Sequence, residues 1–268
     1  GRKANEAPIR VSEKSTDLSP KIIQTLFTYV SLIVGSFIFG TLVIITALFG
    51  DRSGAIWWPY LARNWARQLL YIGGATEVYT EGTEKLQTVT AAIVMCNHES
   101  HFDPPALMRS SPGTLLFLTK HSLFYFPIFG QAMWLMRYVP INRGKSAKAR
   151  KSIDRAARLI AGGRMILIFP EGTRSRSGEM LPFKKGGFVL AAKSGVPIIP
   201  AAIAGTREIL PPGWSCRGRG PIVLLVGEPI DTRGYDMKSK DELMAKVEQE
   251  IVVLRERARE IYREKTAA

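Results

Sequence analysis

Cysteine is scarce in this chain, with two residues in a sequence of 268, Cys96 and Cys216. Neither belongs to a Cys-x-x-Cys pair, and two isolated thiols supply neither a disulfide framework nor the ligands of a structural zinc site. The sequence therefore excludes the small disulfide-rich scaffolds of secreted proteins. It is consistent with a reducing compartment.

Internal repeats and low-complexity linkers are also absent from the sequence. We expect no signal peptide, because no small-residue cleavage site follows the long apolar run near the start. With 22% charged and 46% hydrophobic residues, the composition excludes a disordered polar chain. The length allows one α/β domain with an additional element, or at most two small domains.

Acidic residues are outnumbered, with 23 Asp and Glu against 37 Lys and Arg, which gives a formal net charge of +14. Such a surface favours anionic partners, among them nucleic acid, anionic lipid headgroups and phosphorylated ligands. The charge alone does not choose among these partners.

Charge is missing altogether from residues 22–50, which lie between Lys21 and Arg52. About 20 apolar residues suffice for a helix to cross a bilayer. We therefore predict a membrane-associated helix here, after a polar tail over residues 1–20. The alternative is a buried core helix, although core helices seldom run so long without a charge. Gly35 and Gly40 leave open a bent hairpin within one leaflet.

Residues 57–72 form a second apolar segment with helical periodicity. Its apolar stripe consists of Trp58, Leu61, Trp65, Leu69 and Ile72. Basic residues lie opposite the stripe, which suits a helix in the membrane interface. An ordinary amphipathic helix packed against the core fits the same pattern. We group residues 21–73 as membrane-anchoring and interfacial helices.

From residue 74 to 268 the pattern changes to short strands that alternate with helices. Strands are predicted at 78–79, 91–95, 115–119, 139–141, 165–169, 198–203 and 222–226. Helices are predicted at 104–109, 128–136, 147–161, 188–193 and 241–263. This alternation predicts a layered α/β domain with a mixed sheet flanked by helices.

His98 and Asp103 follow the predicted strand at 91–95. Asp103 precedes Pro104, which is typical of a helix N-cap followed by proline at the first helical position. Across a tight strand-to-helix turn, the carboxylate can fold back onto the imidazole. A histidine held by a carboxylate has a fixed tautomer and a stabilised cation, as a general base for an alcohol requires. Alternatively, Asp103 is only a cap and His98 a satisfied polar residue.

Other chemistry fits this segment less well. His98 and His101 have the spacing H-x-x-H, and no third metal ligand is evident. Ser100 is a conceivable nucleophile, but the sequence has no G-x-S-x-G elbow around it. We expect no bound metal.

Further polar residues follow other predicted strands. Glu171, Gly172, Thr173 and Arg174 come directly after the strand at 165–169, while Lys120 and Arg143 follow two more strands. Ligands of open α/β sheets bind at the carboxyl ends of strands, where these residues would converge. Arginine offers a planar fork for phosphate, and free amides around Gly172 and Thr173 could hold an oxyanion. A solvated basic turn is the simpler alternative.

These segments resemble the motifs of the glycerolipid acyltransferases, the family of 1-acylglycerol-3-phosphate acyltransferases. His98 and Asp103 match N-H-x-x-x-x-D, the H-x4-D motif, and residues 169–175 match F-P-E-G-T-R-S. Arg143 falls at the end of the second motif, and residues 196–200 resemble the fourth. The four motifs keep their order and rough spacing, and the resemblance covers about residues 75–230.

The resemblance implies that His98 is the general base and Asp103 its orienting carboxylate. It places Glu171, Gly172, Thr173 and Arg174 in acceptor binding, with Arg143 and Lys120 near the phosphate. It implies transfer of an acyl group from acyl-CoA or acyl carrier protein to lysophosphatidic acid, without a cofactor or an acyl-enzyme intermediate. The product would be phosphatidic acid, in phospholipid biosynthesis.

Pro140 and Asn142 replace the aromatic and acidic residues usual in the second motif. The acceptor therefore stays open between lysophosphatidic acid, glycerol-3-phosphate, another lysophospholipid and a lyso-aminolipid. We expect anionic membrane lipid as a partner and no nucleic acid. The basic character of the domain predicts the cytoplasmic face of a membrane. A non-catalytic basic protein that binds membrane or nucleic acid is the alternative from a different class.

Overall fold

Seven strands alternate with helices and form one sheet. The computed structural model describes residues 19–50, 56–113, 115–141 and 146–267. The strands are β1 (Ala75–Glu81), β2 (Ala92–Cys96), β3 (Leu115–Lys120), β4 (Val139–Ile141), β5 (Met165–Ile168), β6 (Ile198–Ala204) and β7 (Gly220–Val226). The helices are α1 (Pro20–Leu48), α2 (Trp58–Gly73), α3 (Asp103–Ser110), α4 (Phe129–Leu135), α5 (Ser146–Ala161), α6 (Gly186–Ser194), α7 (Thr206–Ile209) and α8 (Lys240–Ala267), with 3-10 turns η1 (Thr83–Gln87) and η2 (His121–Tyr125). All seven predicted strands are present.

The strand order in the sheet is β1-β7-β6-β2-β5-β3-β4. Strands β6, β2, β5, β3 and β4 are parallel to one another, and β7 pairs antiparallel with β6. The predicted mixed sheet is therefore confirmed. The carboxyl ends of the five parallel strands lie at one edge, where sheets of this kind bind ligands.

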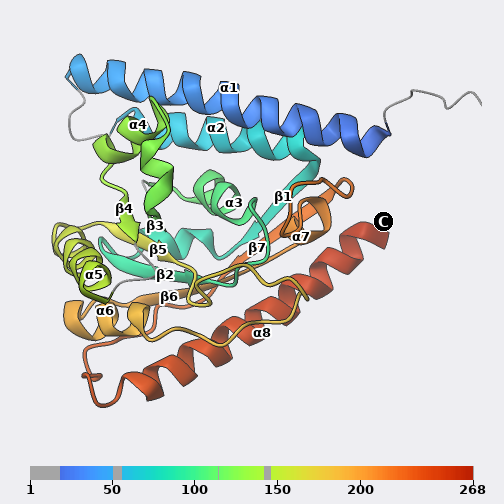
Figure 1. Ribbon diagram of the computed structural model, residues 1–268. Coiled ribbons are helices and arrows are strands. Elements are labelled where there is room, and N and C mark those ends of the chain that lie inside the picture. Colours follow the sequence, from blue (N-terminus) through green and yellow to red (C-terminus); the bar gives the residue numbers. More distant parts are fainter. Residues whose placement is uncertain (1–18, 51–55, 114, 142–145, 268) are drawn as a thin grey trace, which may run out of the picture.

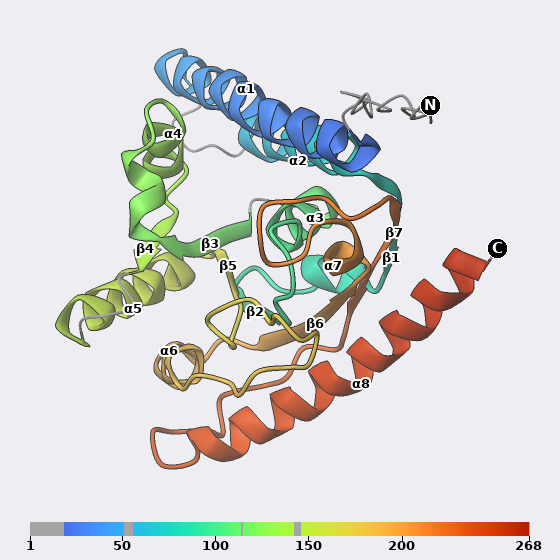
Figure 2. The same ribbon diagram turned by 45° about the vertical axis from the view of Figure 1, so that its right-hand side comes forward.

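Helices cover both faces of the sheet. Figure 1 shows α1, α2 and α3 on one side and α5, α6 and α8 on the other. In Figure 2, α3 and α7 lie over the middle of the sheet, and α8 runs diagonally beneath it toward the carboxyl terminus. The predicted layers of an α/β domain are thus present.

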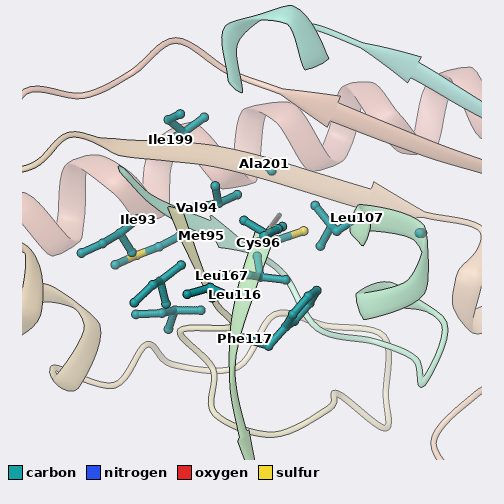
Figure 3. Close-up of a cluster of buried hydrophobic side chains, with 14 of the residues drawn as sticks. Ile93, Val94, Met95, Cys96, Leu107, Leu116, Phe117, Leu167, Ile199 and Ala201 are labelled. Atoms are coloured by element: carbon teal, nitrogen blue, oxygen red, sulfur yellow. The ribbon is translucent and has the colours of Figure 1, made fainter. Parts of the chain in front are cut away.

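The centre of the sheet is apolar along its whole length. Every residue of β2 and β6 is buried, because helices cover both faces of these strands. Figure 3 shows side chains from β2, β3, β5 and β6 packed together with Leu107 of α3. This packed core holds the ends of β2 and β5 in register, since Met95, one residue before the end of β2, pairs with Ile168, the last residue of β5.

The first two helices pack against each other and against the domain. Trp65 of α2 stacks on Phe39 of α1, with ring centroids 5.7 Å apart, and α2 also contacts α3. Trp58 and Leu69 are buried. Most of the apolar stripe of α2 is therefore covered by protein, as in the alternative of an amphipathic helix packed on the core, while Ile72 is exposed. An interfacial position of this helix stays a prediction.

Sequence periodicity did not predict three short elements, α7, η1 and η2. Each has four or five residues, which is too short to show a helical repeat. The long helix α8 was predicted, and Leu243, Val247 and Ile251 form a buried stripe along it. The same stripe continues through Arg255, a charged residue that is also buried.

Candidate active site

The turn between β2 and α3 brings the predicted histidine and carboxylate together. His98 Nδ1 lies 2.8 Å from Asp103 Oδ2. The His98 side chain is 13% exposed and the Asp103 side chain is fully buried. The imidazole stacks on Phe169 at the end of β5, with ring centroids 4.0 Å apart. The predicted contact is therefore present, with one ring face covered and a small part of the imidazole open to solvent.

Both oxygens of the Asp103 carboxylate accept hydrogen bonds. Its Oδ2 also accepts the backbone N–H groups of Glu99 and Ser100, at 2.7 and 2.8 Å. Its Oδ1 accepts the hydroxyl of Thr206 at 2.6 Å. A carboxylate has only acceptors, so we assign the proton of a neutral His98 to Nδ1. Nε2 is then left without a proton, as a base requires.

Asp103 does not cap the following helix. The N-cap of α3 is Phe102, Asp103 is the first helical residue, and no side chain makes a capping hydrogen bond. The predicted N-cap role is therefore wrong. The carboxylate turns backward instead and accepts amides of the preceding turn, which fixes that turn around the imidazole.

Two polar side chains hold the same turn in place, one by contacts with β6 and one by a contact with the residue that follows α7. The Asn97 amide accepts the Ile203 N–H at 2.8 Å and donates to the Ile203 carbonyl at 3.0 Å. Through these two hydrogen bonds the Asn97 side chain extends the pairing between β2 and β6 just past the end of β2. The Ser100 hydroxyl donates to the Leu210 carbonyl at 2.6 Å. Ser100 is fully buried in this contact, which argues against a role as nucleophile.

Glu171 bridges the histidine turn and the loop after β5. Its Oε1 accepts the His98 N–H at 2.7 Å, and its Oε2 accepts the Leu181 N–H at 2.8 Å. The residue is 1% exposed, and burial raises the pKa of its carboxyl above the ordinary value. Both oxygens are directed at the backbone. The geometry therefore gives Glu171 a supporting place behind His98, and direct acceptor binding by Glu171 stays a prediction.

Glu171→Gln is expected to destabilise the protein and lower its turnover. The glutamine NH₂ would face one of two backbone N–H donors, so one hydrogen bond is lost and a buried donor is left unpaired. That costs about 1–3 kcal/mol of unfolding free energy. Thermal unfolding of Glu171→Gln beside Glu179→Gln, an exposed glutamate of the same loop, measures the effect. Equal melting temperatures would contradict the assigned bridge.

The rest of the loop after β5 places a glycine and an arginine beside the histidine turn. Gly172 has φ +70°, and a Cβ there would lie 2.8 Å from the Lys184 side chain. The Gly172 N–H donates to the Phe169 carbonyl at 2.9 Å, so the prediction that it is free to hold an oxyanion is wrong. Thr173 is exposed and Arg174 is partly buried. Lys184 is an exposed cation at this loop that the sequence analysis missed.

Arg174 lies close to His101. Burial, and then the positive charge of Arg174, lower the pKa of His101 to about 4. His101 is therefore neutral at physiological pH. No group of three or more His, Cys, Asp or Glu side chains in the described ranges is arranged to hold a metal ion.

Of the other two predicted cations, Lys120 lies farther along the same edge. Lys120 ends β3 and is exposed, and β5 lies between β3 and β2. Two strand spacings put Lys120 about 10 Å from the line of β2. Arg143 lies outside the described residues, just past the end of β4. The structure thus brings His98, Asp103, Glu171, Gly172 and Arg174 together, with Lys120 at a distance along the edge.

Thr206 is a contributor that the sequence analysis did not find. It is buried and follows β6, whose carboxyl end lies beside that of β2. The only sequence signal for Thr206 was that a hydroxyl residue follows an apolar strand and Gly205. Such residues are common in loops.

The chain is similar in sequence to known proteins. The family model described as Acyltransferase matches residues 77–204. A chloroplastic 1-acyl-sn-glycerol-3-phosphate acyltransferase of Brassica napus is 33% identical over 182 residues, which are 67% of this chain and 52% of the relative. A 1-acyl-sn-glycerol-3-phosphate acyltransferase of Limnanthes douglasii is 32% identical over 191 residues, 69% of this chain and 68% of the relative. The chain thus spans about half of the first relative and two thirds of the second.

The fold is also found in a solved structure. The crystal structure of the 1-acyl-sn-glycerophosphate acyltransferase PlsC from Thermotoga maritima matches with a TM-score of 0.78 and 26% identity, over 90% of this chain and 95% of that chain. Residues 77–204, which the family model matches, contain the β2–α3 turn and the loop after β5, and Thr206 lies two residues beyond them. The chain belongs to the acyltransferase family that includes the 1-acyl-sn-glycerol-3-phosphate acyltransferases.

Proposed function

We propose that this protein transfers an acyl group from a thioester to the free hydroxyl of lysophosphatidic acid, which gives phosphatidic acid. The observation that carries the proposal is the His98–Asp103 contact of 2.8 Å at the carboxyl edge of the sheet, beside the arginine-bearing loop. The similar proteins are named as acyltransferases of 1-acyl-sn-glycerol-3-phosphate or 1-acyl-sn-glycerophosphate.

The proposed reaction is a direct transfer with His98 as the base. Nε2 takes the proton of the acceptor hydroxyl while Nδ1 donates to the Asp103 carboxylate. The alkoxide attacks the thioester carbonyl, an ester C–O bond forms and the thioester C–S bond breaks. The proton on Nε2 passes to the leaving thiolate. His98 returns to its starting state, so the cycle needs neither a metal nor an acyl-enzyme.

The cations at the same edge suit the acceptor phosphate. Arg174 precedes Ser175, whose N–H donates to the His98 carbonyl at 2.9 Å, and this contact supports a place for Arg174 beside the histidine turn. Arginine binds phosphate with a planar pair of donors, which positions as well as attracts. We assign Lys120, farther along the edge, and Arg143 to the phosphate as well. The charge of +14 also favours anionic lipid and the phosphates of the acyl donor.

An assay that pairs several acceptors with two donors tests the function. Lysophosphatidic acid, glycerol-3-phosphate, a larger-headgroup lysophospholipid and a lyso-aminolipid are each offered with acyl-CoA and acyl carrier protein. We expect the highest kcat/KM with lysophosphatidic acid. A higher value for another acceptor would overturn the assigned substrate. If no acceptor leads to consumption of the thioester, and the protein binds nucleic acid in a salt-dependent way, the non-catalytic alternative would be favoured.

The proposed membrane association rests on the two faces of α1. An 18-residue window of this 29-residue helix has a mean hydropathy of 2.3, and among the described helices α1 alone is long and apolar enough to cross a bilayer. Its inner face is attached to the domain by polar contacts. Gln24 Nε2 donates to the carbonyls of Gly73 and Gly218, at 2.6 and 2.7 Å, and Thr46 Oγ1 near the other end accepts from Trp58 Nε1 at 3.2 Å.

The outer face of α1 is apolar and exposed. It carries Ile22, Ile23, Leu26, Phe27, Val30, Ile33, Val34, Phe37, Ile38, Leu42, Ile45 and Leu48. A helix that crossed a bilayer would bring the attached polar groups of the domain into hydrocarbon, where unsatisfied polar groups are costly. We therefore propose that α1 lies in one leaflet with its outer face toward lipid. The cytoplasmic leaflet suits the basic domain, because that leaflet carries anionic lipid.

Ile33→Glu/Phe37→Glu is expected to release the protein from vesicles. Both side chains are more than half exposed, at 69% and 57%. Withdrawing two such side chains from lipid costs about 3–6 kcal/mol, or at least 100-fold in partitioning. Flotation with anionic vesicles measures the bound fraction. Val253→Glu, on an exposed apolar site of α8, is the control. Equal flotation of both variants would contradict the assignment of this face.

A further inference from the structure

The carboxyl-terminal helix contributes a buried ion pair to the histidine turn. Arg255 of α8 donates from Nε and Nη2 to Glu99 Oε1, at 2.9 and 2.7 Å. Both side chains are almost fully buried, with exposed fractions of 5% and 7%. Glu99 is the residue next to His98. This ion pair joins residues that are 156 positions apart in sequence, and one of the two is the neighbour of the proposed base.

Arg255 also holds the second loop of the site. Its Nη2 donates to the Gly178 carbonyl, to which Arg259 Nη2 donates as well, at 2.7 Å. The Gly178 N–H donates to Ser175 Oγ at 3.0 Å, in the loop that follows β5. One guanidinium thus joins the histidine turn to the loop that carries Arg174.

These hydrogen bonds form a closed ring of contacts that includes His98. The Ser175 N–H donates to the His98 carbonyl at 2.9 Å. The path from His98 runs through Ser175 and Gly178 to Arg255, and returns through Glu99. His98 and Arg174 come from different loops, so their separation depends on such cross-links. Reaction geometry is sensitive to shifts of about 1 Å, which can cost 100-fold in rate.

We propose that Arg255 is a positioning residue, which fixes the distance between His98 and the phosphate-binding loop by holding Glu99 and the Gly178 carbonyl together. The inference rests on the proposed role of His98. It assigns a part of the active-site support to α8, beyond the segment that the family model matches, residues 77–204. Lysine cannot replace arginine here, because an ammonium lacks the planar fork that reaches two acceptors in fixed directions.

Arg255→Lys is the first test, in the full-length protein. We expect kcat to fall about 10- to 100-fold while the KM values for lysophosphatidic acid and acyl donor change less than about twofold. Arg257→Lys is the matched control, because Arg257 lies on the same helix and is 57% exposed. Equal kcat in the two variants would overturn the proposal. A higher KM at unchanged kcat would overturn it too, since that result indicates contact with substrate.

A double variant separates positioning from stability. Glu99→Gln/Arg255→Met removes both buried charges, so neither is left unpaired. We expect its melting temperature to be near that of the unchanged protein and its kcat to stay low. Recovery of kcat together with stability would show that the pair only stabilises the fold, and would overturn the proposal. Full activity of His98→Ala would instead overturn the proposed function, so the two failures are distinguishable.

Discussion

His98→Ala is expected to abolish acyl transfer while the protein stays folded. The base abstracts the hydroxyl proton, and general base catalysis contributes about 10²–10⁴-fold to rate. The fold is expected to survive, because the backbone N–H and carbonyl of residue 98 keep their contacts with Glu171 and Ser175. The measurement is kcat with lysophosphatidic acid and acyl-CoA, beside a thermal melt.

The matched control for this experiment is His121→Ala. His121 lies in η2, contacts the Tyr125 ring and makes no contact with Asp103 among those that the structure describes. Its variant should keep its turnover. Near-normal turnover of His98→Ala would remove the central role of this imidazole, whereas loss in both variants would indicate a general effect of removing a histidine.

Asp103→Asn is expected to lower kcat by about 10²–10⁴-fold with little loss of stability. An asparagine oxygen can occupy the place of Oδ2 and accept the same three donors. Its NH₂ can donate to the Thr206 hydroxyl, which then turns from donor to acceptor. The contacts remain, but the negative charge that stabilises a protonated His98 in the transition state is lost.

Asp103→Ala serves as the comparison. It leaves four donors without their acceptor in a fully buried place, and each unpaired buried group costs about 1–3 kcal/mol. We therefore expect a large drop in melting temperature for Asp103→Ala and a small drop for Asp103→Asn, with low kcat in both. Wild-type kcat in Asp103→Asn would show that the charge has no part in catalysis.

The sheet could be predicted because its strands are buried on both faces. Continuous apolar runs such as those of β2 and β6 contrast with the polar turns around them, so composition alone marked each strand. The same contrast marked the residues after the strands as candidates for a site. Membership in the acyltransferase family followed from the order of four motifs, and the matched relatives confirm it.

Contacts between distant segments could not be predicted. Thr206 and Asp103 are 103 positions apart, and Glu99 and Arg255 are 156 apart. The sequence does contain a signal for Arg255, because this residue continues the stripe of Leu243, Val247 and Ile251 at every fourth position. A charged residue in an apolar stripe is a signal for a buried partner, which its neighbours in sequence do not supply.

By itself, the sequence determined which segments are strands and helices, that α1 carries no charge after Lys21, and that His98 and Asp103 share one turn. These properties depend on neighbouring residues and on periodicity. The tertiary structure alone decided that Asp103 accepts donors from α7 and the preceding turn, that Glu171 lies behind the base, and that one face of α1 is attached to the domain. Such properties depend on which segments the sheet order places side by side, and that order is set by the packing of the whole chain.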